Sequence, residues 1–400
     1  MTDTAKSAKP LPPGSMLGVM GGGQLGRMFV HAAQSMGYRT CVLDPDESSP
    51  AGLVSHEHIQ SNYTDAAGLA RLAEMCNAIT TEFENVPATA LQTLAQTRPV
   101  APAGNAVSVA QDRAAEKAFF AQCAAKSGVT PAPYAVIESE ADLQAAAHKL
   151  LPGILKTSRM GYDGKGQARV STASQLTIAW RQLGKVPCVL ESRLTLLSEC
   201  SVIIARNAAG QCVLLPIQKN LHRDGILAVT EVYDGNVPAT LIQKAQAAAQ
   251  AIADGLGYVG VLCVEFFVVQ DGTHCDLVVN EIAPRPHNSG HYSINACDIN
   301  QFELQVRAMA NLPLVSPRLH SPAVMLNILG DLWFAKGDHA SEPAWEQVLA
   351  LPGTHLHLYG KTDARKGRKM GHLTITAARI NDARAVALEA AGILGIAPWI

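Results

Sequence analysis

Short apolar runs that are typical of strands alternate with longer runs that are typical of helices, starting at residue 16. Residues 16–20 and 40–44 have the first pattern, and residues 24–36 between them have the second. The same alternation continues further along this region. Strands that alternate with helices in this way predict a parallel, doubly wound α/β domain. We expect it to cover residues 16–112, after a flexible extension over residues 1–15.

An alanine-rich helical run over 113–127, closed by Gly128, opens a second α/β region. We expect this central domain to cover residues 113–315, because a linker rich in proline follows it. The remaining residues, 316–400, combine alternating strand-like runs with a closing alanine-rich helix, which predicts a small β-rich domain. A chain of 400 residues exceeds what one hydrophobic core usually supports, so several domains are expected. The predicted fold class is α/β, or α+β for the whole chain.

Composition excludes several classes of protein. The formal net charge is −2, so the chain lacks the basic surface of a nucleic-acid-binding protein. The nine cysteines form no CxxC pair, and most lie in apolar runs, such as those around Cys188 and Cys263, which indicates a reducing compartment. No run approaches the ~20 apolar residues of a membrane span, and the first residues lack the apolar core of a signal peptide. We expect a soluble cytoplasmic protein with no membrane or nucleic-acid partner.

A glycine pattern near the start allows two interpretations. Gly21, Gly23 and Gly26 follow a strand-like run and open a helical run, and Asp44 ends the next strand-like run. This is the fingerprint of a dinucleotide site, so a nicotinamide-dependent dehydrogenase has to be considered. The loop itself supplies only backbone amides at the start of a helix, and these suit a substrate phosphate as well as a pyrophosphate.

Several features of the central region suit a nucleotide. Lys156 ends a strand-like run, where its ammonium group could meet phosphate oxygens. Residues 160–167 form a glycine-rich loop that could fold its amides around phosphates as a lid, although a hairpin turn has the same composition. Glu191 leaves another strand-like run, where a strand end and a carboxylate could bind adenine, and Glu199 could bind ribose hydroxyls.

The strongest signal is a set of polar residues inside apolar strands. Glu265 and Glu281 each interrupt a strand-like apolar run, and Asn280 precedes the second of them. An unpaired carboxylate in such a run would be costly. Two carboxylates and a carboxamide on neighbouring strands form a site of hard oxygen ligands that suits magnesium. The alternative is a pair of strand glutamates held in salt bridges.

This ordered set of lysine, glycine-rich loop, strand-end glutamate and paired acidic strands resembles the ATP-grasp superfamily over residues 110–312. Further runs narrow the resemblance to one family. They are residues 22–28 (GGQLGRM), 81–86 (TEFENV), 161–167 (GYDGKGQ), 220–227 (NLHRDGIL), 280–291 (NEIAPRPHNSGH) and 367–372 (GRKMGH). Together they resemble the 5-(carboxyamino)imidazole ribonucleotide synthase family over residues 16–376. The resemblance implies an N-terminal Rossmann-like domain, a central ATP-grasp domain and a small C-terminal domain.

The resemblance also implies an activity. The family joins bicarbonate to the exocyclic amine of aminoimidazole ribonucleotide through carboxyphosphate, with ATP as co-substrate and Mg²⁺ as cofactor, in purine biosynthesis. We therefore expect a ligase that forms a C–N bond and works as a homodimer.

The resemblance places the nucleotide contacts on several groups of residues. The phosphates would be held by Arg113, Lys156, Gly161, Tyr162, Asp163, Gly164, Lys165, Gly166 and Gln167. Adenine would be bound by Glu191, Ser192, Arg193 and Leu194. Glu199 would bind the ribose, and His222 would make a further contact with the nucleotide. Magnesium would be bound by Glu265 and Glu281, with Asn280 beside them.

Aminoimidazole ribonucleotide would lie between the domains. Its contacts would come from Gly23, Gln24, Leu25, Glu84, Tyr162, Asp163 and Lys165. Arg285 and His287 would approach the imidazole and carboxyphosphate, and Lys361 and Arg368 would bind the substrate phosphate. The catalytic residues implied are Arg285, His287 and Lys156, although His287 could instead serve a structural hydrogen bond.

Two departures from the family pattern and three alternatives remain. Residues 191–196 read ESRLTL, where isoleucine or valine and then phenylalanine are more frequent. Lys165 stands where arginine is frequent, which preserves charge but not a bidentate contact. The alternatives are a related ligase that uses formate and glycinamide ribonucleotide, the nicotinamide dehydrogenase, and a scaffold without activity, against which the intact glutamate pair argues.

Overall fold

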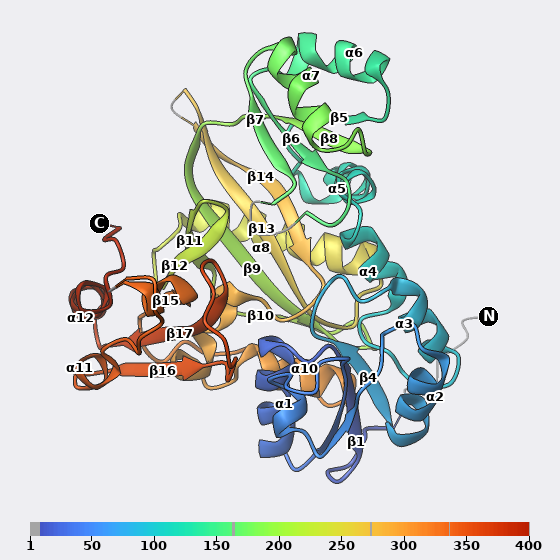
Figure 1. Cartoon of the computed structure of the whole chain (residues 1–400), viewed down its shortest axis with the longest axis vertical. Coiled ribbons are helices and arrows are strands. Elements are labelled where there is room, and N and C mark those ends of the chain that lie inside the picture. The colour runs from blue at the N-terminus through green and yellow to red at the C-terminus, as the bar shows by residue number, and fades with distance from the viewer. Residues whose placement is uncertain (1–8, 162–164, 273, 336, 400) are drawn as a thin grey trace.

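The structure, a computed structural model, describes residues 9–161, 165–272, 274–335 and 337–399. Figure 1 shows the N-terminal region at the bottom, a small sheet with its helices at the top and the C-terminal strands at the left of a long central sheet. Within the described residues, no helix combines the length and apolar content that crossing a bilayer requires.

The N-terminal region is a parallel sheet with strand order β3-β2-β1-β4. Its elements are β1 (Met16–Met20), α1 (Gln24–Ser35), β2 (Arg39–Leu43), η1 (Gly52–Val54), β3 (Glu57–Ile59), α2 (Ala66–Met75), β4 (Ala78–Thr81), α3 (Ala88–Ala95) and α4 (Gly104–Ala110). All of β1 is buried because the sheet is covered on both faces. Leu17 and Val19 enter one hydrophobic cluster, whereas Met16 and Met20 enter the other. The predicted parallel domain is confirmed.

A smaller antiparallel sheet, with strand order β5-β8-β6-β7, follows helix α5. Its elements are α5 (Arg113–Ser127), β5 (Tyr134–Ile137), α6 (Glu140–Leu150), β6 (Gly153–Thr157), β7 (Gln167–Val170), α7 (Ala173–Gln182) and β8 (Cys188–Ser192). Helix α5 begins at Arg113 because the side chain of Asp112 accepts hydrogen bonds from the first free amides, and it ends where Gly128 takes a φ of 67°.

The large sheet has nine strands in the order β14-β13-β9-β11-β12-β15-β17-β16, with β10 paired to β9. The remaining elements are β9 (Leu196–Arg206), β10 (Cys212–Leu214), β11 (Gln218–Arg223), β12 (Ile226–Val232), α8 (Ala239–Gly255), β13 (Gly260–Asp271), β14 (His274–Ala283), η2 (Asn288–Gly290), α9 (Ser293–Ala296), α10 (Gln301–Met309), β15 (Ala323–Leu329), η3 (Gly330–Phe334), α11 (Trp345–Leu349), β16 (Thr354–Leu358), β17 (Lys369–Thr376) and α12 (Ile380–Leu394). Strands β12 and β15 pair antiparallel, with Val229 opposite Leu326. The sheet is therefore continuous across the expected boundary at residue 315.

Helix α10 joins the N-terminal sheet to the large sheet. Phe302 and Val306 pack into the cluster of the N-terminal region, whereas Leu304 packs into the cluster of the large sheet. Between them, the buried amide of Gln305 accepts a hydrogen bond of 2.6 Å from Val261 N and donates one of 2.9 Å to the Thr80 hydroxyl. This helix therefore fixes how the two sheets are placed.

Replacing Gln305 by leucine tests this junction. Gln305→Leu introduces an apolar side chain of similar size and removes the hydrogen bonds to the Val261 amide and the Thr80 hydroxyl. We expect the free energy of unfolding to fall by about 1–3 kcal/mol, measured by urea denaturation followed by circular dichroism. The control is Gln122→Leu at an exposed position of α5, where the change should stay within about 0.5 kcal/mol. Equal effects of the two variants would contradict the assigned role.

Candidate active site

Glu265 and Glu281 lie opposite each other on the neighbouring antiparallel strands β13 and β14. The register shifts directly after Glu265, because Phe266 pairs with Val279 and Asn280 becomes the extra residue of a bulge. A bulge of this kind redirects the side chains around it. The structure thus brings the predicted acidic residues together and places Asn280 beside them.

The surroundings of the two carboxylates differ. Burial, together with the neighbouring charge of Glu281, raises the pKa of Glu265 to about 7. Partial burial also raises the pKa of Glu281, but Arg113 and Lys156 outweigh it and hold that pKa below its usual value. The side chain of Glu281 is 42% exposed, so it can meet a ligand. A cation between the carboxylates would favour the charged form of both.

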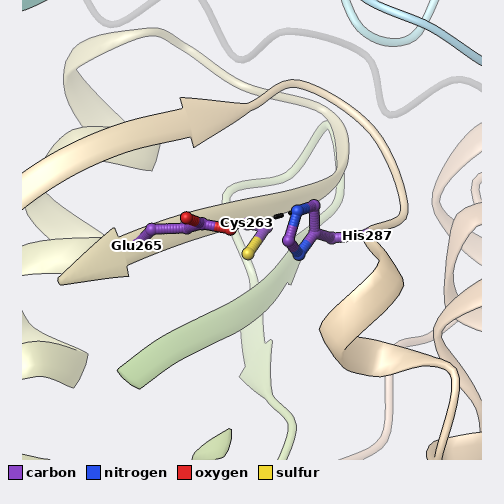
Figure 2. Close-up of side chains that lie close together, drawn as sticks. All are labelled: Cys263, Glu265 and His287. Atoms are coloured by element: carbon purple, nitrogen blue, oxygen red, sulfur yellow. Dashed lines mark ion pairs between the residues drawn. The ribbon is translucent and has the colours of Figure 1, made fainter. Parts of the chain in front are cut away.

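His287 and Cys263 lie close to the carboxylate of Glu265 (Figure 2). The Nε2 atom of His287 is 3.1 Å from Oε1 of Glu265, and the ligand atoms of all three residues lie within 4.8 Å of one another. Burial raises the pKa of the Cys263 thiol and lowers the pKa of His287, whose Nδ1 atom contacts the hydroxyl of Ser289. A protonated thiol and an imidazole are poor magnesium ligands, so the oxygens of Glu265 and Glu281 remain the better donors.

The predicted lid is held at both of its described ends. Arg113 approaches Glu281 at 3.2 Å and donates a hydrogen bond of 3.1 Å to the carbonyl of Gly161. The carbonyl of Gly166 accepts a hydrogen bond from the amide of Thr157. The predicted contacts Tyr162, Asp163 and Gly164 lie outside the described residues. The neighbouring predicted residues Lys165 and Gln167 are exposed.

Glu191 bridges two lysines. Its carboxylate lies 3.1 Å from Nζ of Lys156 and 3.3 Å from Nζ of Lys117. Burial raises the pKa of Glu191, but the lysines outweigh burial and lower it. The sequence suggested this carboxylate as an acceptor for the adenine amino group. In the structure both of its oxygens face lysines instead, because Lys117 on α5 reaches the end of β8.

The residues after Glu191 form a mostly exposed strand end. The amides of Ser192 and Arg193 donate hydrogen bonds to the carbonyls of Pro133 and Pro152, so these two amides are already used. The predicted residue Leu194 is partly exposed. Glu199 and His222, from the neighbouring strands β9 and β11, form an ion pair.

The amides of the N-terminal glycine loop are bound by carboxylates of the chain itself. Asp44 accepts a hydrogen bond of 2.7 Å from Gly22, and Glu82 accepts hydrogen bonds of 2.9 and 3.1 Å from Gly23 and Gly26. A phosphate at these amides would therefore have to displace the carboxylate of Glu82 from the start of helix α1. The dehydrogenase alternative loses its structural basis for the same reason.

Two predicted contacts beside this loop differ in exposure. Gln24 is partly exposed at the first position of α1, whereas Leu25 is buried in the cluster of the N-terminal region. The side chain of Leu25 thus packs in the core rather than facing a ligand.

An ion pair connects the N-terminal region to the large sheet. Arg285, which follows β14, contacts the carboxylate of Glu84. Burial would raise the pKa of Glu84, but Arg285 and, more weakly, Lys369 outweigh it and lower the pKa to about 2. The structure thus brings the predicted residues Glu84 and Arg285 into direct contact.

The predicted phosphate contacts Lys361 and Arg368 lie on the loop between β16 and β17, and both are partly exposed. Lys361 donates a hydrogen bond to the carbonyl of Lys369, and Arg368 donates one to the carbonyl of Asp363. A Cβ atom on Gly360 would meet the Arg27 guanidinium at 2.8 Å, which shows that this loop packs against α1. This loop between β16 and β17, called the basic loop below, therefore borders the N-terminal region.

Family models match three consecutive parts of the chain. They describe a ribonucleotide synthetase preATP-grasp domain over residues 15–111, an ATP-grasp domain over 122–302 and a phosphoribosylaminoimidazole carboxylase C-terminal domain over 323–386. The N5-carboxyaminoimidazole ribonucleotide synthase of Brucella melitensis is 43% identical over 91% of this chain and 97% of the relative. The chain belongs to the N5-carboxyaminoimidazole ribonucleotide synthase family.

Solved structures of this family have the same fold. The Staphylococcus aureus N5-carboxyaminoimidazole synthetase complexed with ADP is 36% identical, with a TM-score of 0.86 over 96% of this chain and 98% of that chain. The Aspergillus clavatus N5-carboxyaminoimidazole synthase in complex with ADP and 5-aminoimidazole ribonucleotide is 29% identical, with a TM-score of 0.84 over 96% and 99%.

Membership of the N5-carboxyaminoimidazole ribonucleotide synthase family confirms the predicted class of reaction. The enzyme is an ATP-dependent ligase that forms a C–N bond, and its reaction is the carboxylation of aminoimidazole ribonucleotide in purine biosynthesis. The predicted order of preATP-grasp, ATP-grasp and C-terminal domains is also confirmed.

Sequence reasoning missed several buried charges in this synthase. Lys117 and Glu116 lie in an alanine-rich helical run, and Glu82 lies in a quoted motif without an assigned role. Adjacent charges in such a run are typical of the exposed face of a helix, so no local signal marked the first pair.

The pair of Glu199 and His222 predicts a pH dependence. Burial lowers the pKa of His222, but the hydrogen bond to Glu199 outweighs it and raises the pKa to about 9 from 6.5. The ion pair therefore contributes stability fully below about pH 6.5 and loses that contribution as the pH rises through about 9. We expect a ring titration of His222 with its midpoint near pH 9 in nuclear magnetic resonance spectra. Glu199→Gln should lower the midpoint, because the hydrogen bond and the charge of Glu199 are lost while burial still opposes the charged ring.

The matched control is Glu389→Gln, at an exposed position of α12, which should leave the midpoint unchanged. A midpoint near 6.5 in the unaltered enzyme would contradict the assigned ion pair.

Proposed function

We propose that this enzyme takes its carboxyl group from bicarbonate, activates it with ATP as carboxyphosphate in a magnesium-dependent step, and transfers it to the exocyclic amine of aminoimidazole ribonucleotide. The observation that carries the proposal is the contact of Glu265 with Glu281 across β13 and β14. Relatives crystallised with ADP and with ADP plus 5-aminoimidazole ribonucleotide support a site for both substrates.

The residues present fit a magnesium ion. Glu265 and Glu281 supply carboxylate oxygens, and Asn280 adds a carboxamide at the bulge. Burial is the main cause of the raised pKa of Glu265, and the charge of Glu281 adds to it; a divalent cation would favour the charged form of both carboxylates. An ion held by these residues would offset the charge that builds up on the nucleotide phosphates during transfer.

Two cations beside the carboxylates, Arg113 and Lys156, hold the phosphates of ATP. Arg113 already contacts both Glu281 and the first lid residue, Gly161, so it can follow the γ-phosphate when the lid closes. Lys156 presents its ammonium group from β6, oriented by Glu191. The lid excludes water, which matters because carboxyphosphate hydrolyses readily.

The adenosine part lies along the ends of β8 and β9. Residues 191–194 form the strand end that borders adenine, with Glu191 acting through its backbone because its carboxylate is taken by lysines. Glu199 binds the ribose hydroxyls, and the charged His222 beside it orients that carboxylate.

Aminoimidazole ribonucleotide enters between the N-terminal region and the basic loop. Lys361 and Arg368 bind its phosphate, since the amides of the glycine loop are taken by Glu82 and Asp44. Arg285, held by Glu84, and His287, held by Glu265, face the imidazole and the carboxyphosphate.

The reaction proceeds in two steps. An oxygen of bicarbonate attacks the γ-phosphorus of ATP, and the bond from that phosphorus to the ADP oxygen breaks. Lys156 and Arg113 stabilise the charge on the transferring group. Carboxyphosphate then separates into CO₂ and phosphate, and the amine nitrogen captures CO₂ and loses a proton. Arg285 holds the departing phosphate, whose oxygens can take up the proton, and His287 stays in contact with Glu265.

Removing one carboxylate tests the metal assignment. Glu281→Gln should lower ADP formation by about 100-fold or more, because a neutral amide neither binds the cation strongly nor pairs with Arg113. ADP release measures the loss, and an unchanged circular dichroism spectrum shows that the fold is intact. Glu389→Gln on the exposed face of α12 should retain full activity. Unaltered turnover in Glu281→Gln would contradict the proposed metal site.

Labelled bicarbonate tests the carboxyl source. With ¹⁸O-bicarbonate, one labelled oxygen should appear in inorganic phosphate, because the attacking oxygen stays on phosphorus when carboxyphosphate breaks. Mass spectrometry of the phosphate measures the transfer, and omission of aminoimidazole ribonucleotide should suppress it. Unlabelled phosphate during full turnover would exclude carboxyphosphate. Formate with glycinamide ribonucleotide should release no ADP, and release would favour the formate-dependent alternative.

We further propose that the enzyme works as a homodimer in the cytoplasm. The homodimer rests on the family resemblance alone. The cytoplasmic location is supported by the cysteines, all of which are free and most of which are buried, as expected in a reducing compartment.

A further inference from the structure

The strand that carries Glu281 is at the edge of its sheet. Among the described strands, β14 pairs along its length with β13 only. Backbone groups on its outer side therefore need partners from elsewhere. They find them on α5 and the segment that follows it, which lie beside β14 in Figure 1.

Two consecutive side chains of α5 bind the backbone on either side of Glu281. Lys117 donates a hydrogen bond of 2.8 Å from Nζ to the carbonyl of Asn280. Oε1 of Glu116 accepts a hydrogen bond of 2.8 Å from the amide of Ile282. The bulge that carries Asn280 and Glu281 is thus held at both of its ends by one helix.

A third contact from the same face of α5 reaches the carboxylate itself. Arg113 approaches Glu281 Oε2 at 3.2 Å. Residues three and four positions apart share one face of a helix, so Arg113, Glu116 and Lys117 point together toward β14. Lys117 also lies 3.3 Å from Glu191, whose carboxylate contacts Lys156.

The burial of this pair is costly for a purely structural role. Glu116 is 2% exposed and Lys117 is 1% exposed. Charged residues are rarely buried to this degree, and apolar residues of similar volume usually stabilise a core at least as well as a buried ion pair. Ionic groups at these positions are therefore better explained by the geometry that they impose on the backbone around Glu281.

We propose that Glu116 and Lys117 are positioning residues, which set the bulge of β14 so that Glu281 and Asn280 face the magnesium ion. Lys117 also ties this bulge to Glu191 at the nucleotide strand end, so one helix aligns the metal ligands and the adenine site. The inference rests on the proposed metal role of Glu281.

Two variants of Glu116 separate the reach of the side chain from its carboxyl group. Glu116→Asp keeps the carboxyl group but is one methylene too short to reach the Ile282 amide. Glu116→Gln replaces the carboxyl group by an amide but keeps an oxygen at the same distance. We expect Glu116→Asp to raise the Mg²⁺ concentration for half-maximal ADP release by about 10-fold or more, with little change in KM for aminoimidazole ribonucleotide. Glu116→Gln should need a Mg²⁺ concentration close to that of the unaltered enzyme.

Lys117→Met removes the hydrogen bond to Asn280 at nearly constant volume. We expect it to raise both the Mg²⁺ requirement and the KM for ATP by about 10-fold. The matched control is Lys126→Met, at an exposed lysine of the same helix, which should match the unaltered enzyme.

A readout that needs no activity accompanies the kinetics. Hydrogen exchange of the segment 279–283, measured by mass spectrometry without metal or nucleotide, should be faster in Glu116→Asp and Lys117→Met. It should be nearly unchanged in Glu116→Gln and Lys126→Met. If Lys117→Met does not fold, the comparison of the two Glu116 variants decides alone.

The proposal is overturned if Glu116→Asp shows the Mg²⁺ requirement and the exchange of the unaltered enzyme, or if Glu116→Gln is as impaired as Glu116→Asp. Glu281→Gln is measured beside them as the reference. Full activity of Glu281→Gln would refute the metal site itself. Loss of activity in Glu281→Gln, with unaltered metal dependence in Glu116→Asp, would refute only the positioning role.

Discussion

Two carboxylates face each other across β13 and β14, and most of the charges in the active site compensate for that contact. Like charges directly opposite on neighbouring strands are unfavourable. Arg113, Lys156 and Lys117 lower the pKa of Glu281 from one side, although burial opposes them. The charges of His222 and Lys369 act on Glu265 from the other. The proposed magnesium site is thus organised before any ligand arrives, which would reduce the reorganisation needed during phosphoryl transfer.

The sequence predicted the acidic pair and its strands because both signals are local. A glutamate that interrupts an apolar strand-like run is visible without knowledge of its partners, and Glu265 and Glu281 both do so. The alternation of strands and helices likewise predicted the parallel N-terminal sheet. The continuity of the large sheet through β12 and β15 was not predictable, since Val229 and Leu326 lie far apart in the sequence and a proline-rich linker suggested a boundary.

The roles of Glu82, Glu116 and Lys117 could not be derived from the sequence. Lys117 binds a carbonyl 163 positions away, and Glu116 binds an amide 166 positions away. In the alanine-rich run around them, each charge looks like an ordinary exposed residue of a helix. The same holds for Glu191, whose place at a strand end suggested contact with adenine. Which groups surround a carboxylate depends on tertiary packing, and local patterns do not contain that information.

The N-terminal glycine loop shows how one motif can serve different chemistry. Its geometry, a strand, a tight turn and a helix start, is that of a dinucleotide site. The outcome depends on which group satisfies the free amides at the helix start, and here Glu82 and Asp44 do so. A carboxylate that already binds these amides leaves them unavailable to a second anion, so the proposed site of the substrate phosphate relies on cations elsewhere. Lys361 and Arg368 are the suitable groups because the C-terminal strands extend the large sheet and bring their loop against α1.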